Sequence, residues 1–141
     1  RLLVEPAGAR AAAGVFDPAV AATHSSRVHT LLEPDSSTVE EFLVVNRDIH
    51  VTVATAAGNG RQQALVERLL DESERAIAVA FNAGLPGGGP RVRGEHLALL
   101  SALRDGDGDG AADAMASTIT HFRDDLLEIL SGTASVLDAQ L

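Results

Sequence analysis

The sequence predicts an all-α fold, an antiparallel bundle of six to seven helices. Apolar residues recur mostly at helical spacing, and nothing in the sequence has the character of a β-strand. Glycine, proline and aspartate interrupt the apolar pattern repeatedly, which divides the chain into about six helices joined by mostly short connections. Helices joined in this way pack as antiparallel neighbours. The length of 141 residues fits a single domain, 1–141.

The first two helices are predicted from proline and a capping residue. The first spans about 1–13, where Pro6 is tolerable near the start of the helix or as a kink. Asp17 followed by Pro18 predicts a capping residue and the first position of a second helix, which reaches about Leu32.

The third and fourth helices follow from a capping pattern and a glycine-rich turn. Ser37 and Glu40 have the spacing of a capping box and open a third helix that runs to Ala57. After Gly58-Asn59-Gly60, a fourth helix spans about 61–82. Its predicted buried positions are Leu65, Leu69, Ile77 and Phe81.

A run of glycine and proline at 84–90 separates the fourth helix from the last two. The fifth helix spans about 92–104, and 105–110 is predicted to be a flexible turn. The sixth helix runs from Ala111 to about residue 130 and is predicted to end at Ser131-Gly132. Its predicted buried positions are Met115, Ile119, Phe122, Leu126 and Leu130.

Composition excludes several classes of function. The net charge is −9 and every one of the 11 basic residues is Arg, so the chain is not expected to bind DNA itself. The absence of cysteine excludes thiolate chemistry. No apolar run approaches the ~20 residues of a membrane span, and no signal peptide is recognisable, so a cytoplasmic location is expected. The first residue is Arg rather than Met, which suggests that upstream residues are missing.

Three polar residues stand in predicted core positions. Asn46 and His50 lie four residues apart on the third helix, so both side chains can point at one spot. His96 heads an apolar row on the fifth helix. Burying such groups without partners costs on the order of 1–3 kcal/mol. Each could be a core residue satisfied by the backbone, but together they predict a polar pocket suited to a divalent ion or a small acid.

Several segments resemble the signature of a known family. The third helix carries Asn46-Arg47-Asp48-Ile49-His50, followed by Gly58-Asn59. The fifth carries Glu95-His96, then an apolar helix and Gly106-Asp107, and the sixth begins with Ala114-Met115. In their order and spacing these segments resemble the FCD domain of FadR-type GntR transcription regulators. Residues 1–13 are similar to the first helix of that family.

The resemblance implies a dimeric bacterial regulator whose helical domain binds a small carboxylate effector, often through a divalent metal such as Zn or Ni. It places Asn46, His50 and His96 at metal-ligand positions. The family's last ligand, a histidine, corresponds to Thr118, while His121 lies one helical turn further on. The candidate metal ligands are therefore Asn46, His50, His96 and His121, and the candidate effector pocket comprises Asn46, His50, His96 and Thr118. Binding without a metal stays open.

The resemblance also implies that DNA is bound by a separate N-terminal winged helix-turn-helix domain, which is absent from this chain. It further implies that the helical domain formed by residues 1–141 is not an enzyme. Two other functions remain open. A metal-dependent hydrolase could use His50 and His96, although no carboxylate base is evident at a suitable spacing. A ligand-free dimerisation bundle could have a polar core that satisfies itself.

Overall fold

The computed structural model describes residues 1–31, 38–82 and 90–138, and these residues form six helices and no strand. The predicted all-α bundle is therefore confirmed. In chain order the helices are α1 (Glu5–Ala13), α2 (Pro18–Leu31), α3 (Val39–Ala56), α4 (Gly60–Asn82), α5 (Pro90–Arg104) and α6 (Gly108–Asp138). None of the described helices has the length and apolar character needed to cross a membrane.

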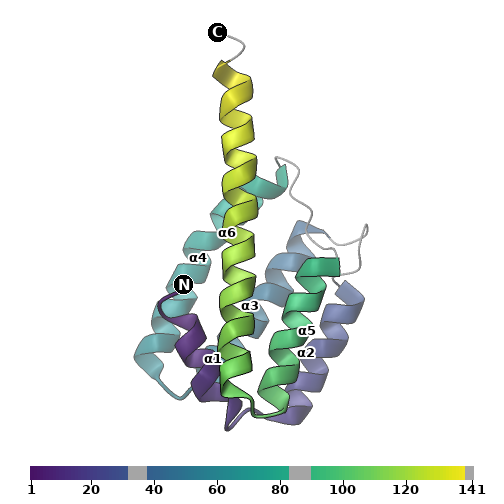
Figure 1. Ribbon diagram of the computed structural model, residues 1–141, viewed down its shortest axis with the longest axis vertical. Coiled ribbons are helices and arrows are strands. Elements are labelled where there is room, and N and C mark those ends of the chain that lie inside the picture. Colours follow the sequence, from purple (N-terminus) through teal and green to yellow (C-terminus); the bar gives the residue numbers. More distant parts are fainter. Residues whose placement is uncertain (32–37, 83–89, 139–141) are drawn as a thin grey trace.

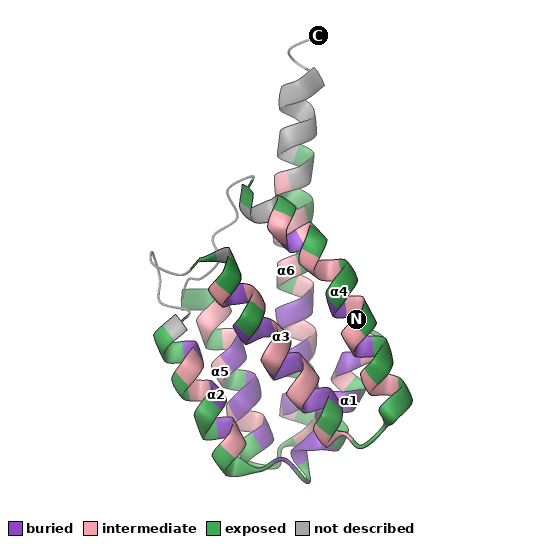
Figure 2. Ribbon diagram, turned by 180° about the vertical axis from the view of Figure 1, so that it is seen from behind, coloured by how far each residue is buried: buried purple, intermediate pink, exposed green. Residues whose placement is uncertain are grey.

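The longest helix, α6, organises the bundle. It packs against α1 and α5, while α3 packs against α4 and α2 behind them (Figure 1). Beyond this contact region the C-terminal part of α6 extends past the other helices (Figure 1). Most buried positions of α3, α5 and α6 turn toward the inside of the bundle (Figure 2). One core forms from Val45 and Ile49 of α3, Leu99 and Leu103 of α5, and Met115 of α6.

The first helix begins later than the sequence predicted, at Glu5 rather than Arg1. Pro6 stands in the first turn of α1, where its missing N–H breaks no helical hydrogen bond. Residues 1–4 form a turn in which the Val4 amide donates to the Arg1 carbonyl at 2.9 Å. This turn folds Arg1 back toward Glu5.

The capping box of α3 lies one residue further along than predicted. The Thr38 amide donates to Glu41 Oε2 at 2.7 Å, and the Glu41 amide donates to Thr38 Oγ1 at 3.2 Å. The pairs 37/40 and 38/41 fit the same sequence pattern, so the pattern alone could not separate them. Ser37 lies outside the described residues.

The buried face of α4 also differs from the prediction. Leu65 is 44% exposed and Leu69 is half-buried, while Phe81 lies outside the described side chains. Ile77 is buried, as predicted, but the other buried apolar residues of the helix are Val66 and Leu70. A rotation of α4 about its axis by one residue changes which side chains meet α3. The apolar pattern of the helix is compatible with both the predicted and the observed buried face.

The sixth helix is longer at both ends than predicted. It begins at Gly108, within the predicted turn, because Asp107 Oδ1 accepts the Gly110 amide at 2.9 Å and caps the first turn. It continues through Ser131 and Gly132 to Asp138. A glycine inside a helix costs only about 1 kcal/mol relative to alanine, which does not stop an otherwise favourable helix.

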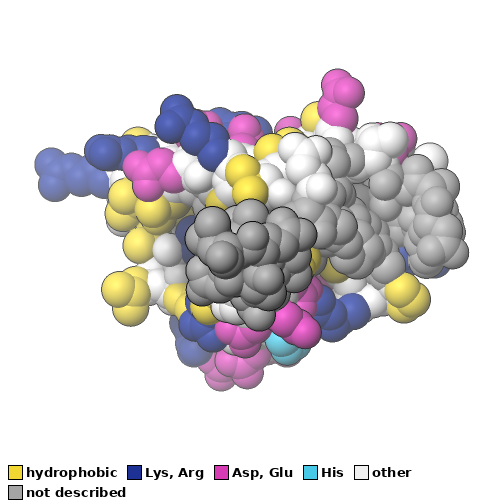
Figure 3. Space-filling view, turned by 90° about the horizontal axis from the view of Figure 1, so that it is seen from above, with side chains coloured by type: hydrophobic (Ala, Val, Ile, Leu, Met, Phe, Trp, Pro, Cys, Tyr) yellow, Lys and Arg dark blue, Asp and Glu magenta, His cyan; other side chains and the backbone are white. Residues whose placement is uncertain are grey.

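The surface carries charges of both signs. On the face shown in Figure 3, Arg side chains are interrupted by acidic and hydrophobic ones, and hydrophobic side chains gather on one side. The described part of this face therefore offers no continuous basic surface of the kind that follows a phosphate backbone.

Candidate functional site

The polar residues singled out in the sequence meet inside the bundle. His50 and His96 are each 1% exposed, and their ring centroids lie 6.3 Å apart with the planes at 84°. Asn46 is 5% exposed and Thr118 is 7% exposed. The structure therefore brings together one side of α3, the first half of α5 and the middle of α6.

A small cavity of about 30 Å³ lies at this meeting point. Its polar lining includes Arg1, Asn46, His96 and Thr118. Its apolar walls are Phe42, Ile77, Val92, Ile119 and Phe122. Arg91, Glu95 and Asp125 complete the lining. A cavity of this size has room for about one or two water molecules, so a larger ligand requires the side chains around it to move.

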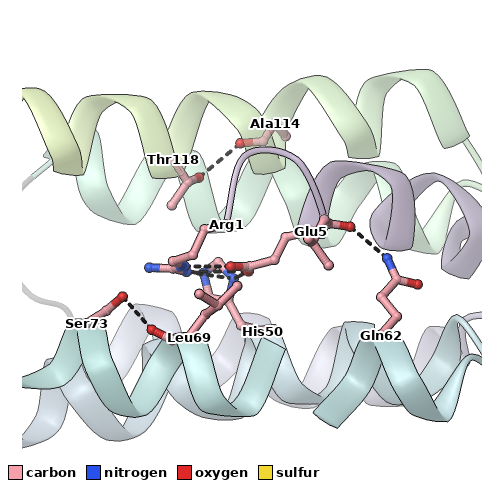
Figure 4. Close-up of polar contacts among 9 residues, drawn as sticks. Arg1, Glu5, His50, Gln62, Leu69, Ser73, Ala114 and Thr118 are labelled. Carbon is pink, nitrogen blue, oxygen red and sulfur yellow. Dashed lines mark hydrogen bonds and ion pairs between the residues drawn. The ribbon is translucent and has the colours of Figure 1, made fainter. Parts of the chain in front are cut away.

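Two residues of the cluster were missed by sequence reasoning, Arg1 and Glu5. Arg1 Nε donates to Glu5 Oε1 at 2.5 Å, and the other oxygen of Glu5 accepts a hydrogen bond from His50 Nδ1 (Figure 4). Arg1 Nη2 lies 3.1 Å from Nδ1 and 3.3 Å from Nε2 of His50. The available signal was an acid four residues after an arginine, a spacing too common to mark a site.

The turn that carries Arg1 is attached to the bundle. Gln62 of α4 donates its side-chain amide to the Val4 carbonyl at 2.7 Å (Figure 4). Glu5 is itself 3% exposed. The position of the Arg1 guanidinium is therefore set by its contacts with Glu5 of α1 and His50 of α3, and by the attachment of the turn to α4.

The Glu5–His50 pair has a defined proton arrangement. Burial alone would raise the pKa of Glu5, but His50 and Arg1 outweigh burial and lower it to about 2, so Glu5 is a carboxylate. Burial lowers the pKa of His50 and outweighs the Glu5 carboxylate, which raises it, while Arg1 adds to the lowering, so the ring is neutral near pH 7. A neutral ring that donates from Nδ1 to a carboxylate has its lone pair on Nε2. Arg1 Nη2 is the donor beside that lone pair.

His96 has the same tautomer but lacks a second partner. Its Nδ1 donates to the Val92 carbonyl at 2.8 Å, and burial lowers its pKa to about 4. Its Nε2 is therefore an unprotonated acceptor. Within the described part of the chain, this buried atom has no hydrogen-bond partner. His96 thus presents an unsatisfied lone pair beside the cavity.

The structure also places the two alternatives for the last ligand position. Thr118 lines the cavity and donates its hydroxyl to the Ala114 carbonyl at 3.0 Å. His121 has a side chain that is 46% exposed, and its Nδ1 lies 2.5 Å from Glu95 Oε1. His121 therefore lies apart from His50 and His96, while Thr118 lines the same cavity as Asn46 and His96. His50, the remaining predicted pocket residue, lines a different, smaller cavity.

The donors in the cluster do not suit a tightly held divalent ion. Both histidines have an unprotonated Nε2, as metal-ligating histidines do. The neighbouring Asn46 and Thr118, however, are neutral and weak ligands. Among the described residues, no group of three or more His, Cys, Asp or Glu side chains could hold a metal. The positive guanidinium of Arg1 already lies beside Nε2 of His50. The predicted Zn or Ni ion stays a prediction that this donor set does not favour.

One residue outside the cluster contradicts its sequence assignment. The polar neighbours Ser25, Ser26 and Arg27 predict that both His24 and His29 of α2 lie on the surface. His24 is instead 8% exposed, and its Nε2 lies 3.2 Å from Thr52 Oγ1 of α3. This contact joins α2 to α3 away from the cavity. His29 is exposed, as predicted.

Together, the fold and the site define a helical domain with a buried polar cavity. The FCD domain model matches residues 1–121, which include α1 to α5 and the part of α6 that carries Thr118 and His121. The chain therefore belongs to the FCD family, whose members are the C-terminal effector-binding domains of GntR-family regulators. No curated protein and no solved structure matches it.

Proposed function

We propose that this chain is the ligand-sensing domain of a bacterial GntR-family transcription regulator and that it binds a small carboxylate effector in the cavity. The observation that carries the proposal is Arg1. Its side chain is 12% exposed and lines an otherwise mostly apolar cavity. A guanidinium in that position is a natural partner for a carboxylate.

The charges around Arg1 leave it able to bind an anion. A guanidinium has five N–H donors, and Glu5 accepts from one of them, Nε, at 2.5 Å. His50 and His96 are neutral and add no charge of either sign. A bound carboxylate would therefore use the remaining donors of Arg1, with the amide of Asn46 as a second donor on the cavity wall.

Effector binding would control DNA binding through an attached winged helix-turn-helix domain, in a homodimer. Support for a separate DNA-binding part comes from the net charge of −9. In the proposed regulator that part is the N-terminal winged helix-turn-helix domain that the family implies.

The test is a thermal-shift screen of small organic acids against the purified chain. Binding to the folded state raises the melting temperature. We expect the shift in the wild type and in Arg10→Gln, whose arginine is exposed on α1 and pairs with Asp109. We expect it to be lost in Arg1→Gln. A shift that is equal in all three proteins would contradict the proposal.

The same acids also test the hydrolase and the ligand-free bundle. A sensor leaves its ligand unchanged, so the effector should be recovered intact after long incubation. Sustained product formation would favour the enzyme. No shift with any acid, together with a gain in stability when His50 and His96 are both replaced by Leu, would favour the ligand-free bundle.

A further inference from the structure

The inner cavity shares a wall with a larger groove on the surface. This outer groove has about 360 Å³ and lies between α4, α6 and the turn formed by residues 1–4. Arg1, Ile119 and Phe122 line both spaces. The rest of the groove is mostly apolar and includes Leu2, Ala76 and Leu126. One layer of side chains therefore separates a cavity with room for one or two water molecules from a groove that can admit a small acid.

We propose that the outer groove is the entrance to the inner cavity and that the turn formed by residues 1–4 is its lid. The structure shows the lid closed, with Arg1 in the wall between the two spaces and the turn lying between α4 and α6 (Figure 4). A movement of the turn away from α6 carries Arg1 with it and joins the cavity to the groove. The inference rests on the proposed function only for the identity of what enters.

The lid is held by few contacts. It lies outside α1, which begins at Glu5. Leu2 packs against the core with part of its surface, but Leu3 is 96% exposed. Gln62 of α4 ties the backbone of the lid to the bundle through the hydrogen bond to the Val4 carbonyl. Segments with so little buried apolar surface open at a lower free energy than the rest of a fold.

The opposite side of the cavity is closed more firmly. There α5 and α6 pack along each other. Arg91 of α5 pairs with Asp125 of α6. Glu95 of α5 pairs with His121 of α6. An opening on this side has to separate two packed helices and expose their apolar faces, whereas the lid is a short turn outside any helix. The lid is therefore the easier part of the wall to move.

The open lid is a minor state. Opening separates the Arg1 guanidinium from Glu5 and His50, so the closed state predominates in the empty protein. Minor conformations of this kind are typically populated at roughly 0.1–10%. A carboxylate that has entered offers Arg1 a new partner, which favours closure over the occupied cavity.

An introduced cysteine can measure the opening without any acid, because the chain contains no cysteine. Thr118→Cys replaces a residue of similar size that is 7% exposed and lines the inner cavity. Its rate of reaction with methyl methanethiosulfonate, a small neutral reagent, reports access to the cavity. Asp113→Cys, at an exposed position of the same helix, is the reference. We expect the cavity position to react about 10- to 1,000-fold more slowly, in line with the population of the open state.

Three further substitutions, each combined with Thr118→Cys, locate the entrance. Gln62→Ala removes the hydrogen bond that holds the lid and should speed the reaction about fivefold, the typical effect of one hydrogen bond. Arg91→Gln removes the ion pair with Asp125 on the opposite side and should leave the rate unchanged. Thr38→Ala removes the cap of α3, away from both sides, and controls for a loss of overall stability.

The other outcomes overturn the lid. If Gln62→Ala does not speed the reaction, or speeds it no more than Thr38→Ala does, the reagent does not enter by a local opening of the turn. If Arg91→Gln has the larger effect, the entrance lies between α5 and α6. Should Thr118→Cys not fold, Asn46→Cys on the α3 wall of the cavity replaces it with the same expectations. Because no acid is used, failure of the lid leaves the proposed function standing, and a thermal-shift screen without any binding acid leaves the lid standing.

Discussion

The guanidinium of Arg1 lies against the imidazole ring of His50, with Nη2 3.3 Å from Nε2. Glu5 bridges both, accepting from Arg1 and from Nδ1 of His50. This contact joins the start of the chain to the middle of α3 and sets a positive charge beside the cavity.

Removing the Glu5 charge should destabilise the fold. In Glu5→Gln, Arg1 remains largely buried and loses its carboxylate partner, which typically costs about 3–5 kcal/mol for a buried pair. Urea unfolding followed by circular dichroism measures the change. The control is Glu72→Gln, since the Glu72–Arg68 pair is exposed and should contribute less than about 1 kcal/mol. Equal losses in both variants would show that the Glu5 contacts are not stabilising.

Stability should fall as the pH is lowered below neutrality. His96 has a folded pKa of about 4 against an ordinary value of 6.5, so the unfolded chain binds its proton first. Stability is therefore lost as the pH falls from 6.5 toward 4, by about 1.4 kcal/mol per pH unit for one proton. The lowered pKa of His50 acts in the same direction.

Glu5 extends this loss to lower pH. Its folded pKa of about 2 lies below the ordinary 4.5, so its contribution is present above pH 4.5 and is lost as the pH falls toward 2.

Chemical unfolding at a series of pH values gives the slope of the unfolding free energy against pH. His96→Gln should flatten the slope between pH 6.5 and 4 and leave the lower part unchanged. A wild-type slope that matches this variant would contradict the assignment.

The metal question can be settled by restoring the missing ligands. Wild-type protein loaded with Zn or Ni and then dialysed should retain far less than one equivalent, because among the described residues the cluster offers only two strong ligands, His50 and His96. The double substitution Asn46→Asp with Thr118→His adds one charge and one imidazole at the same cavity, so it should retain about one equivalent. Elemental analysis measures the metal retained by each of the two proteins, and the melting temperature measures how far that metal stabilises it. One full equivalent in the wild type would show that the present donors suffice.

The capping box of α3 can be separated from its alternative by two single substitutions. Thr38→Ala should lower the free energy of unfolding by about 1 kcal/mol, because the Glu41 amide loses its acceptor. Ser37→Ala should have a smaller effect. Urea unfolding of both variants measures the difference, and the reverse order would place the cap at Ser37.

Individual elements show what can be predicted from a sequence of this kind. The periodic apolar residues predicted α3 and α5, and polar residues within those stripes indicated Asn46, His50 and His96 as a cluster. Local patterns were less decisive. Two overlapping capping boxes and two possible faces of α4 could be distinguished only by how the helices pack, because each alternative is equally favourable within its own segment.

By itself, the sequence determined the helical bundle, the family and three of the polar pocket residues, because helical spacing and motif order are local properties of the chain. The tertiary structure alone decided that Arg1 and Glu5 join His50, that Thr118 rather than His121 lines the cavity, and that His96 Nε2 is left as an acceptor. The contacts of Arg1 and Glu5 with His50 and the position of Thr118 depend on how separate segments of the chain pack together, which the linear sequence does not reveal. The proton of His96, by contrast, is fixed within α5 by the Val92 carbonyl one turn earlier, and only packing decides that its Nε2 is buried beside the cavity without a partner among the described residues.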